Sequence, residues 1–69
     1  MSKTVIGRRC TILFSQELLA MRLKRLVGRK GYVVDIPEHH QGVFVELDEE
    51  FIGEKEWYIP KASVQYCDL

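Results

Sequence analysis

The chain contains few of the residues that build metal centres, disulfide frameworks or membrane spans. Its 69 residues include two cysteines, two prolines and one tryptophan. Two cysteines are too few for a zinc site made of thiolates. No apolar run approaches the roughly 20 residues that cross a bilayer, and the first residues lack the long apolar segment of a signal peptide. We therefore expect a cytoplasmic protein that does not engage a membrane.

The two cysteines leave three interpretations open. The simplest is that Cys10 and Cys67 are small apolar residues on the first and last strands. A disulfide between those strands would require that they are neighbours, and an oxidising compartment would favour it. The third interpretation is a reactive thiol.

The net charge of zero hides a strong segregation of charge along the chain. Residues 1–30 hold eight Lys or Arg against Glu17 alone, whereas residues 31–69 hold nine Asp or Glu against two Lys. Such asymmetry can indicate a basic binding face. In one small domain, however, the two halves interleave in space, and the charges can pair across strands. The pattern favours pairing or mixing of the charges, with a basic face as the alternative.

Alternation of apolar and polar residues predicts a mainly β fold. A chain of this length forms one domain, which we expect to span residues 1–69. Period-two patterns predict five strands, at residues 4–13, 32–36, 43–48, 56–59 and 64–67. We expect these strands to form a meander that closes on itself into a small barrel, which removes exposed strand edges.

One helix and one tight turn complete the expected fold. Ser15 is a suitable N-cap, Glu17 falls in the first turn, and leucines follow at helical spacing, so we predict a helix over residues 16–25. Gly28 is a suitable stop. Residues 60–63 should form a tight turn, because proline fixes its own backbone angle and breaks a strand ladder.

The sequence W-Y-I-P-K-A-S-V at residues 57–64 resembles the "G-Y-I-P-S-N-Y-V" ending of the Src-homology-3-like small barrels. In that family a fourth strand breaks at the proline and one helical turn leads to the last strand. The resemblance implies a five-stranded Src-homology-3-like barrel with one short helix inserted after the first strand. Ser63 stands at the family's tyrosine position and Trp57 is the only tryptophan. An aromatic groove for a polyproline helix is therefore poorly supplied.

The sequence G-R-K-G-Y-V-V-D-I at residues 28–36 resembles the KOW motif of ribosomal proteins and transcription factors. Those modules contact RNA or a protein partner through the loop beside the glycines. The resemblance implies such a role for Arg29 and Lys30, with Arg22, Lys24 and Arg25 nearby. Clustered cations replace counterions along a phosphate backbone. The zero net charge and the acidic second hairpin oppose this interpretation, because nucleic-acid-binding domains are usually basic.

Two aromatic residues are the best candidates for a protein-binding surface. Strand alternation places Phe44 and Tyr58 outward on adjacent strands. Outward aromatics of this kind make an apolar patch typical of an interface. The helix could instead cover them. It could also form an exposed ridge for a partner, since Leu18 and Met21 lie off its main apolar stripe.

No set of residues predicts catalysis, a cofactor or a metal. Ser15 and Ser63 are better explained as a cap and a turn residue, and a small barrel has little room to shelter a carboxylate pair. His39 and His40 are adjacent on a turn, point in different directions and lack a third ligand at useful spacing. The acidic run at residues 48–50 lacks the alternating donors of a calcium loop.

These observations predict a non-catalytic binding module. It would act as an adaptor or small regulatory subunit that makes protein–protein contacts through its barrel surface. The alternative is KOW-type binding of RNA, DNA or a ribonucleoprotein through the basic residues 22–30.

Overall fold

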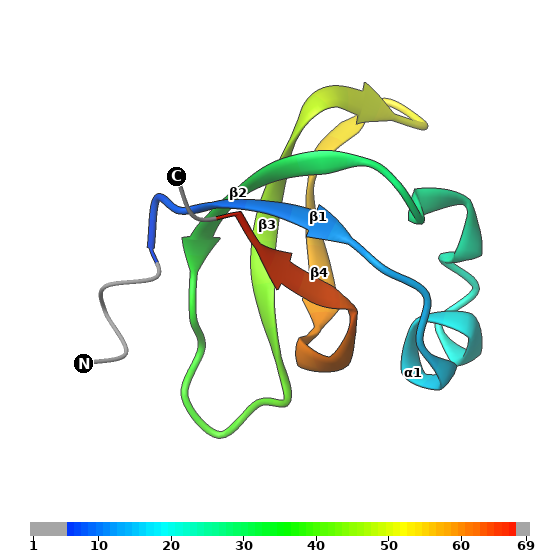
Figure 1. Cartoon of the computed structure of the whole chain (residues 1–69), viewed down its shortest axis with the longest axis horizontal. Helices are drawn as coiled ribbons and strands as arrows, with labels where there is room; N and C mark the ends of the chain where they lie inside the picture. The colour runs from blue at the N-terminus through cyan, green and yellow to red at the C-terminus, as the bar shows by residue number, and fades with distance from the viewer. Residues whose placement is uncertain (1–5, 68–69) are drawn as a thin grey trace.

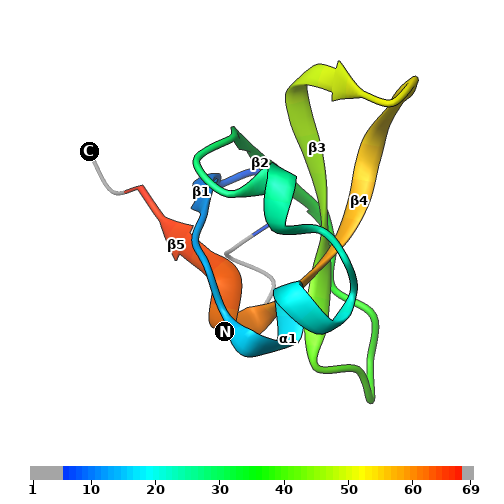
Figure 2. The same cartoon turned by 90° about the vertical axis from the view of Figure 1, so that its right-hand side faces the viewer.

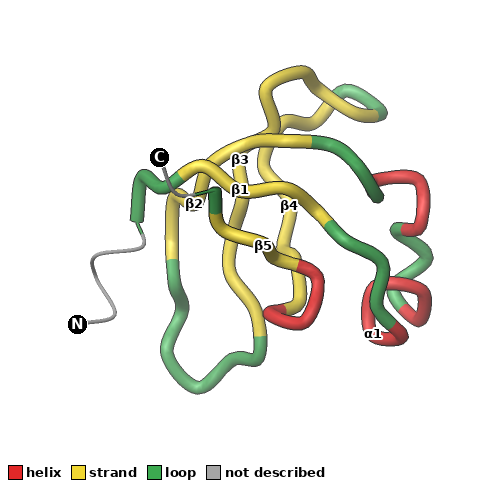
Figure 3. The backbone as a smooth tube through the Cα atoms, in the orientation of Figure 1, coloured by secondary structure: helices red, strands yellow, loops and turns green. Residues whose placement is uncertain are grey.

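The computed structural model describes residues 6–67, in which five strands and one α-helix are present. The elements follow in the order β1 (Arg9–Ile12), α1 (Gln16–Ala20), the 3-10 turn η2 (Lys24–Leu26), β2 (Lys30–Asp35), β3 (Gly42–Phe51), β4 (Glu54–Pro60), the 3-10 turn η3 (Lys61–Ser63) and β5 (Val64–Tyr66). The mainly β class is confirmed. The expected first strand began at residue 4, and its first two residues lie outside the described part. Figures 1 and 3 show α1 and η2 together at one end of the sheet.

The strands form one antiparallel sheet in the order β4-β3-β2-β1-β5. This order is compatible with a Src-homology-3-like barrel. The first and last strands are neighbours, with Cys10 opposite Tyr66. Strands β4 and β5 occupy the two edges of the sheet, and no pairing joins them within residues 6–67. The sheet is therefore not closed, and its closure into a barrel stays a prediction.

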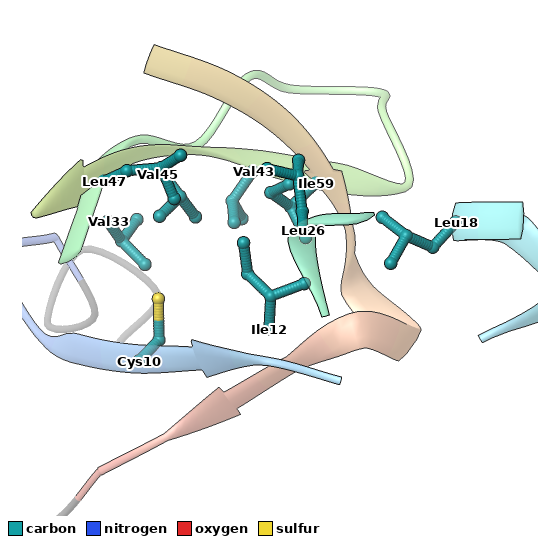
Figure 4. Close-up of a cluster of buried hydrophobic side chains, with 9 residues drawn as sticks. All are labelled: Cys10, Ile12, Leu18, Leu26, Val33, Val43, Val45, Leu47 and Ile59. Carbon is teal, nitrogen blue, oxygen red and sulfur yellow. The ribbon is translucent and has the colours of Figure 1, made fainter. Parts of the chain in front are cut away.

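A core of nine side chains fills the space enclosed by the sheet and the helical turns (Figure 4). Strand β3 contributes the alternating residues Val43, Val45 and Leu47, each no more than 2% exposed. The other six are Cys10, Ile12, Leu18, Leu26, Val33 and Ile59. Because alternation along β3 directs these three side chains inward, it also directs Phe44 outward.

The helix is shorter than the leucine spacing predicts. Ser15 caps it, because the Leu18 N–H donates to Ser15 Oγ at 3.1 Å. The helix ends at Ala20, and Arg22 then takes a left-handed backbone with φ +64°. This change of direction breaks the apolar stripe expected along residues 16–25. The expectation that Leu18 would lie on an exposed ridge is wrong, since Leu18 is 0% exposed and Leu19 is 44% exposed.

A pair of buried hydroxyl groups fixes α1 against the turn that follows β4. Ser15 Oγ and Ser63 Oγ lie 2.5 Å apart. In addition, the Leu13 N–H donates to the Ser63 carbonyl oxygen at 2.6 Å. The expected tight turn at residues 60–63 is confirmed as η3. Ser63 is thus part of the join between α1 and η3, which sets the shape of the surface between them.

Both cysteines are free thiols, so the disulfide interpretation is wrong. Cys10 is 1% exposed among the core side chains, which confirms its interpretation as a small apolar residue. Cys67 is exposed, and its sulfur lies 3.6 Å from Thr11 Oγ1. Burial raises the pKa of the Cys10 thiol to about 11.

Candidate functional site

An open groove of about 580 Å³ lies between α1 and the end of β4 with η3. Its apolar lining residues are Ala20, Met21, Tyr58, Pro60 and Ala62. Figure 2 shows α1 beside the end of β4 and the turn η3, which carry Pro60 and Ala62. Glu17 and Lys61 add one charge of each sign. The groove therefore offers an apolar surface with no net charge preference.

Strand pairing positions Tyr58 in this groove. Tyr58 on β4 is the register partner of Phe44 on β3, and their rings meet edge to face with centroids 5.3 Å apart. The His40 ring approaches Tyr58 at 6.2 Å. A Cβ on Gly42 would lie only 2.8 Å from Tyr58 Cζ, so glycine leaves the space that the ring needs. The expected outward direction of both aromatic residues is confirmed, and each is half-buried.

Met21 supplies the opposite wall from the end of α1. Its backbone N–H donates to the Glu17 carbonyl at 3.1 Å, and the residue is 39% exposed. The structure thus brings Met21 and Tyr58 to one groove. Phe44 supports Tyr58, and Leu18 lies in the core instead.

Two groups of residues were not predicted from the sequence: two that line the groove, and two exposed apolar residues at α1. Pro60 and Ala62 line the groove, and the proline break in the W-Y-I-P-K-A-S-V segment was the signal that could have placed them. Phe14, just before α1, is 50% exposed, and Leu19, on α1, is 44% exposed. No sequence pattern marks Phe14 as a surface residue. The leucine spacing places Leu19 on the buried stripe of the expected helix.

The five basic residues at 22–30 divide into two groups. Arg22, Lys24 and Arg25 are exposed on the turn after α1 and on η2. The Arg29 guanidinium instead lies 4.7 Å from the Phe51 ring centroid, which is cation–π geometry, and its Nε donates to the Arg25 carbonyl at 3.3 Å. Lys30 lines a small pocket together with the acids Asp48 and Glu49.

Strand β3 carries the main ion pair of the described residues. Arg9 donates to both carboxylate oxygens of Asp48, at 2.6 and 2.8 Å. These hydrogen bonds hold the pKa of Asp48 below its ordinary value. Arg9 was not singled out from the sequence, because only the fold brings β1 and the end of β3 together.

Within residues 6–67 no three His, Cys, Asp or Glu side chains gather in a way that could hold a metal ion. In the same part of the chain, no helix has the length and apolar character needed to cross a membrane. Comparison with protein-family models, curated proteins and solved structures finds no match. The function therefore has to be inferred from the geometry and chemistry of the surface itself.

Proposed function

We propose that this chain is a non-catalytic binding module built as a Src-homology-3-like barrel. It acts as an adaptor or small regulatory subunit that contacts a protein partner through the groove between α1 and η3. The observation that supports this proposal best is the apolar groove itself, with Met21 and Tyr58 on its two sides. Keeping apolar surface in water is unfavourable, and a partner's side chain that covers it gains free energy.

The lining residues indicate what kind of segment fits. Glu17 and Lys61 offset each other, so a highly charged ligand gains little. Tyr58 presents an aromatic ring that Phe44 and His40 hold in place. A rigid aromatic ring is a typical anchor of protein interfaces because little side-chain entropy is lost on binding. The expected ligand is a protein segment that inserts an apolar side chain beside Tyr58.

The test is capture from the native organism followed by affinity measurement. Proteins retained by the purified chain are identified by mass spectrometry, then titrated calorimetrically against the wild type, Met21→Ser and Leu19→Ser. Met21 and Leu19 are similarly exposed, at 39% and 44%, and only Met21 lines the groove. We expect Met21→Ser to weaken binding about tenfold, as loss of one buried apolar side chain should. Leu19→Ser should have little effect. Equal binding by the wild type and Met21→Ser would exclude the groove.

The second candidate function is KOW-type binding of RNA, DNA or a ribonucleoprotein. It is supported by the three exposed cations Arg22, Lys24 and Arg25, which follow one another closely. Arg29 and Lys30 contribute less to this function, because one packs on Phe51 and the other lies beside acids. Titration with generic RNA and DNA at increasing salt separates the two functions. Steep weakening that disappears when the three exposed cations become glutamine supports nucleic-acid binding. No binding at low salt excludes it.

A further inference from the structure

The hairpin between β3 and β4 ends in an unusual residue. Its two-residue turn is Ile52-Gly53, and both have positive φ, +52° and +78°. Such turns favour Asn, Asp or Gly at the first position, and a β-branched residue in this backbone region is strained. Ile52 is also 75% exposed, the highest value among the exposed large apolar residues of the described part. Neither turn geometry nor core packing accounts for isoleucine here.

Acidic residues surround this tip. We define residues 49–56 as the acidic finger, in which Glu49, Glu50, Glu54 and Glu56 are exposed and Lys55 is the one cation. Strand β3 has ten residues and β2 has six, and their pairing ends with Gly31 opposite Leu47. The acidic finger therefore extends beyond its neighbouring strand. Figure 2 shows this hairpin projecting away from the rest of the sheet.

A surface of complementary charge lies on the same molecule. We define residues 22–27 as the basic turn, in which Arg22, Lys24 and Arg25 are exposed. It also presents an apolar side chain, Val27, which is 41% exposed. The ion pairs within residues 6–67 join Arg9 to Asp48 and His39 to Glu38, so none links the basic turn to the acidic finger. Both surfaces are thus available for a contact between molecules.

We propose that the acidic finger of one copy docks on the basic turn of a second copy, with Ile52 against Val27. Reciprocal contact gives a two-fold dimer, in which each contact occurs twice. Charge complementarity supports a second copy as the occupant, and a net charge of zero means that two copies do not repel each other overall. The dimer contact uses neither Tyr58 nor Met21, so it stands independently of the proposed groove function.

The first test measures self-association of the purified full chain. Sedimentation equilibrium over a range of concentrations should detect a monomer–dimer equilibrium that weakens as salt is added. Ile52→Asn should lower the association constant about tenfold or more, because it removes the apolar tip. The same variant should raise the melting temperature of the monomer, because Asn suits the turn better. A variant that merely misfolds would lower both quantities. A wild-type chain that stays monomeric at its highest soluble concentration in low salt overturns the proposal.

The second test exchanges the charges. A variant with Glu50→Lys and Glu54→Lys, and another with Lys24→Glu and Arg25→Glu, should each be monomeric alone. Mixing the two should restore a dimer, because every finger then meets a turn of opposite charge. Glu38→Lys is the matched control, since Glu38 is exposed and lies outside both surfaces. It should dimerise like the wild type. A mixture that stays monomeric, or a control that is monomeric, overturns the proposed contact.

Discussion

Replacing Gly31 with alanine should strongly destabilise the fold, because β2 and β3 approach closely at this residue. Gly31 pairs with Leu47. A Cβ there would lie 2.2 Å from the Glu46 carbonyl oxygen, 2.9 Å from its carbonyl carbon and 3.0 Å from Leu47 Cα. All three are backbone atoms, so no side-chain rotation relieves the clash. The two strands must separate by about 0.8 Å merely to bring the shortest contact to 3.0 Å.

The expected cost follows from the rigidity of the site. Overpacking a well-packed interior costs about 1–3 kcal/mol, and we expect about 3 kcal/mol here because backbone must move. A domain of this size has a free energy of unfolding of roughly 3–10 kcal/mol. For small domains each kcal/mol corresponds to roughly 4–8 °C in melting temperature. Gly31→Ala should therefore lower the melting temperature by roughly 12–24 °C, measured by circular dichroism and by urea unfolding.

Gly28→Ala is the matched control for this experiment. Gly28 has φ +89° and open space where a Cβ would stand, so alanine there costs backbone strain without a clash. That strain is about 1–2 kcal/mol. Gly31→Ala should be the more destabilising of the two, although its backbone is ordinary. A loss of less than about 0.5 kcal/mol for Gly31→Ala, the range of neutral surface changes, would refute the close approach of β2 and β3.

Four further predictions concern single side chains. A maleimide at neutral pH should label Cys67 in the native chain and Cys10 only after unfolding. Intact mass spectrometry would count the attached labels. Labelling of both cysteines in the native chain would contradict the burial of Cys10. Because burial raises the pKa of Cys10 from about 9 to about 11, thiolate forms more easily in the unfolded chain. The free energy of unfolding should therefore fall as the pH rises from 9 to 11, and Cys10→Ala should reduce that slope, leaving the part that comes from the raised pKa values of Tyr32 and Tyr66. Ser63→Ala should lower the free energy of unfolding, measured with urea, by about 1–2 kcal/mol, because it removes one partner of the buried Ser15–Ser63 hydroxyl pair. The lowered pKa of Asp48 contributes stability above its ordinary pKa, and this contribution is lost as the pH falls through the native value. Arg9→Gln should flatten that acid dependence, and an unchanged acid profile would show that the ion pair contributes nothing.

The strands were predictable because their signals are local. Alternation of Val43, Val45 and Leu47 identified β3 and its buried face, and Pro60 marked the end of β4. The strand itself continues to Phe51, three residues beyond the expected end. Two of these added residues, Glu49 and Glu50, are acidic, and strand propensity does not favour them. Phe51 pairs with Glu54 on β4, so the strand continues to the turn, and sequence alternation does not report that pairing.

The helix and its apolar face were less predictable, because they depend on one backbone angle. Leucines at helical spacing indicated a helix through residue 25, but the left-handed backbone of Arg22 follows the end of α1 closely. Arginine rarely adopts this conformation, so nothing in the sequence marks it. Because the helix ends early, Leu18 is buried and Leu19 is exposed, which is the reverse of what the leucine spacing predicts. Of the expected protein-binding residues, the structure accordingly brings Met21 and Tyr58 to one groove, while Leu18 fills the core.

The lengths of β2 and β3 explain why charge segregation alone could not decide between paired charges and an unpaired face. Antiparallel pairing brings β1 and the start of β2 beside the middle of β3, so Arg9 pairs with Asp48 and Lys30 lines a small pocket with the same carboxylate. Strand β3 then continues beyond β2, and its hairpin carries acids that have no cation within ion-pair distance in the described part. One molecule therefore has both arrangements of charge. Opposite charges pair where the strands overlap, and the acids stay unpaired where β3 is longer than β2. If the unpaired charges were only a solvated surface, exchanging their signs would leave self-association unchanged, whereas a docking contact requires the mixed variants to associate and each variant alone to fail.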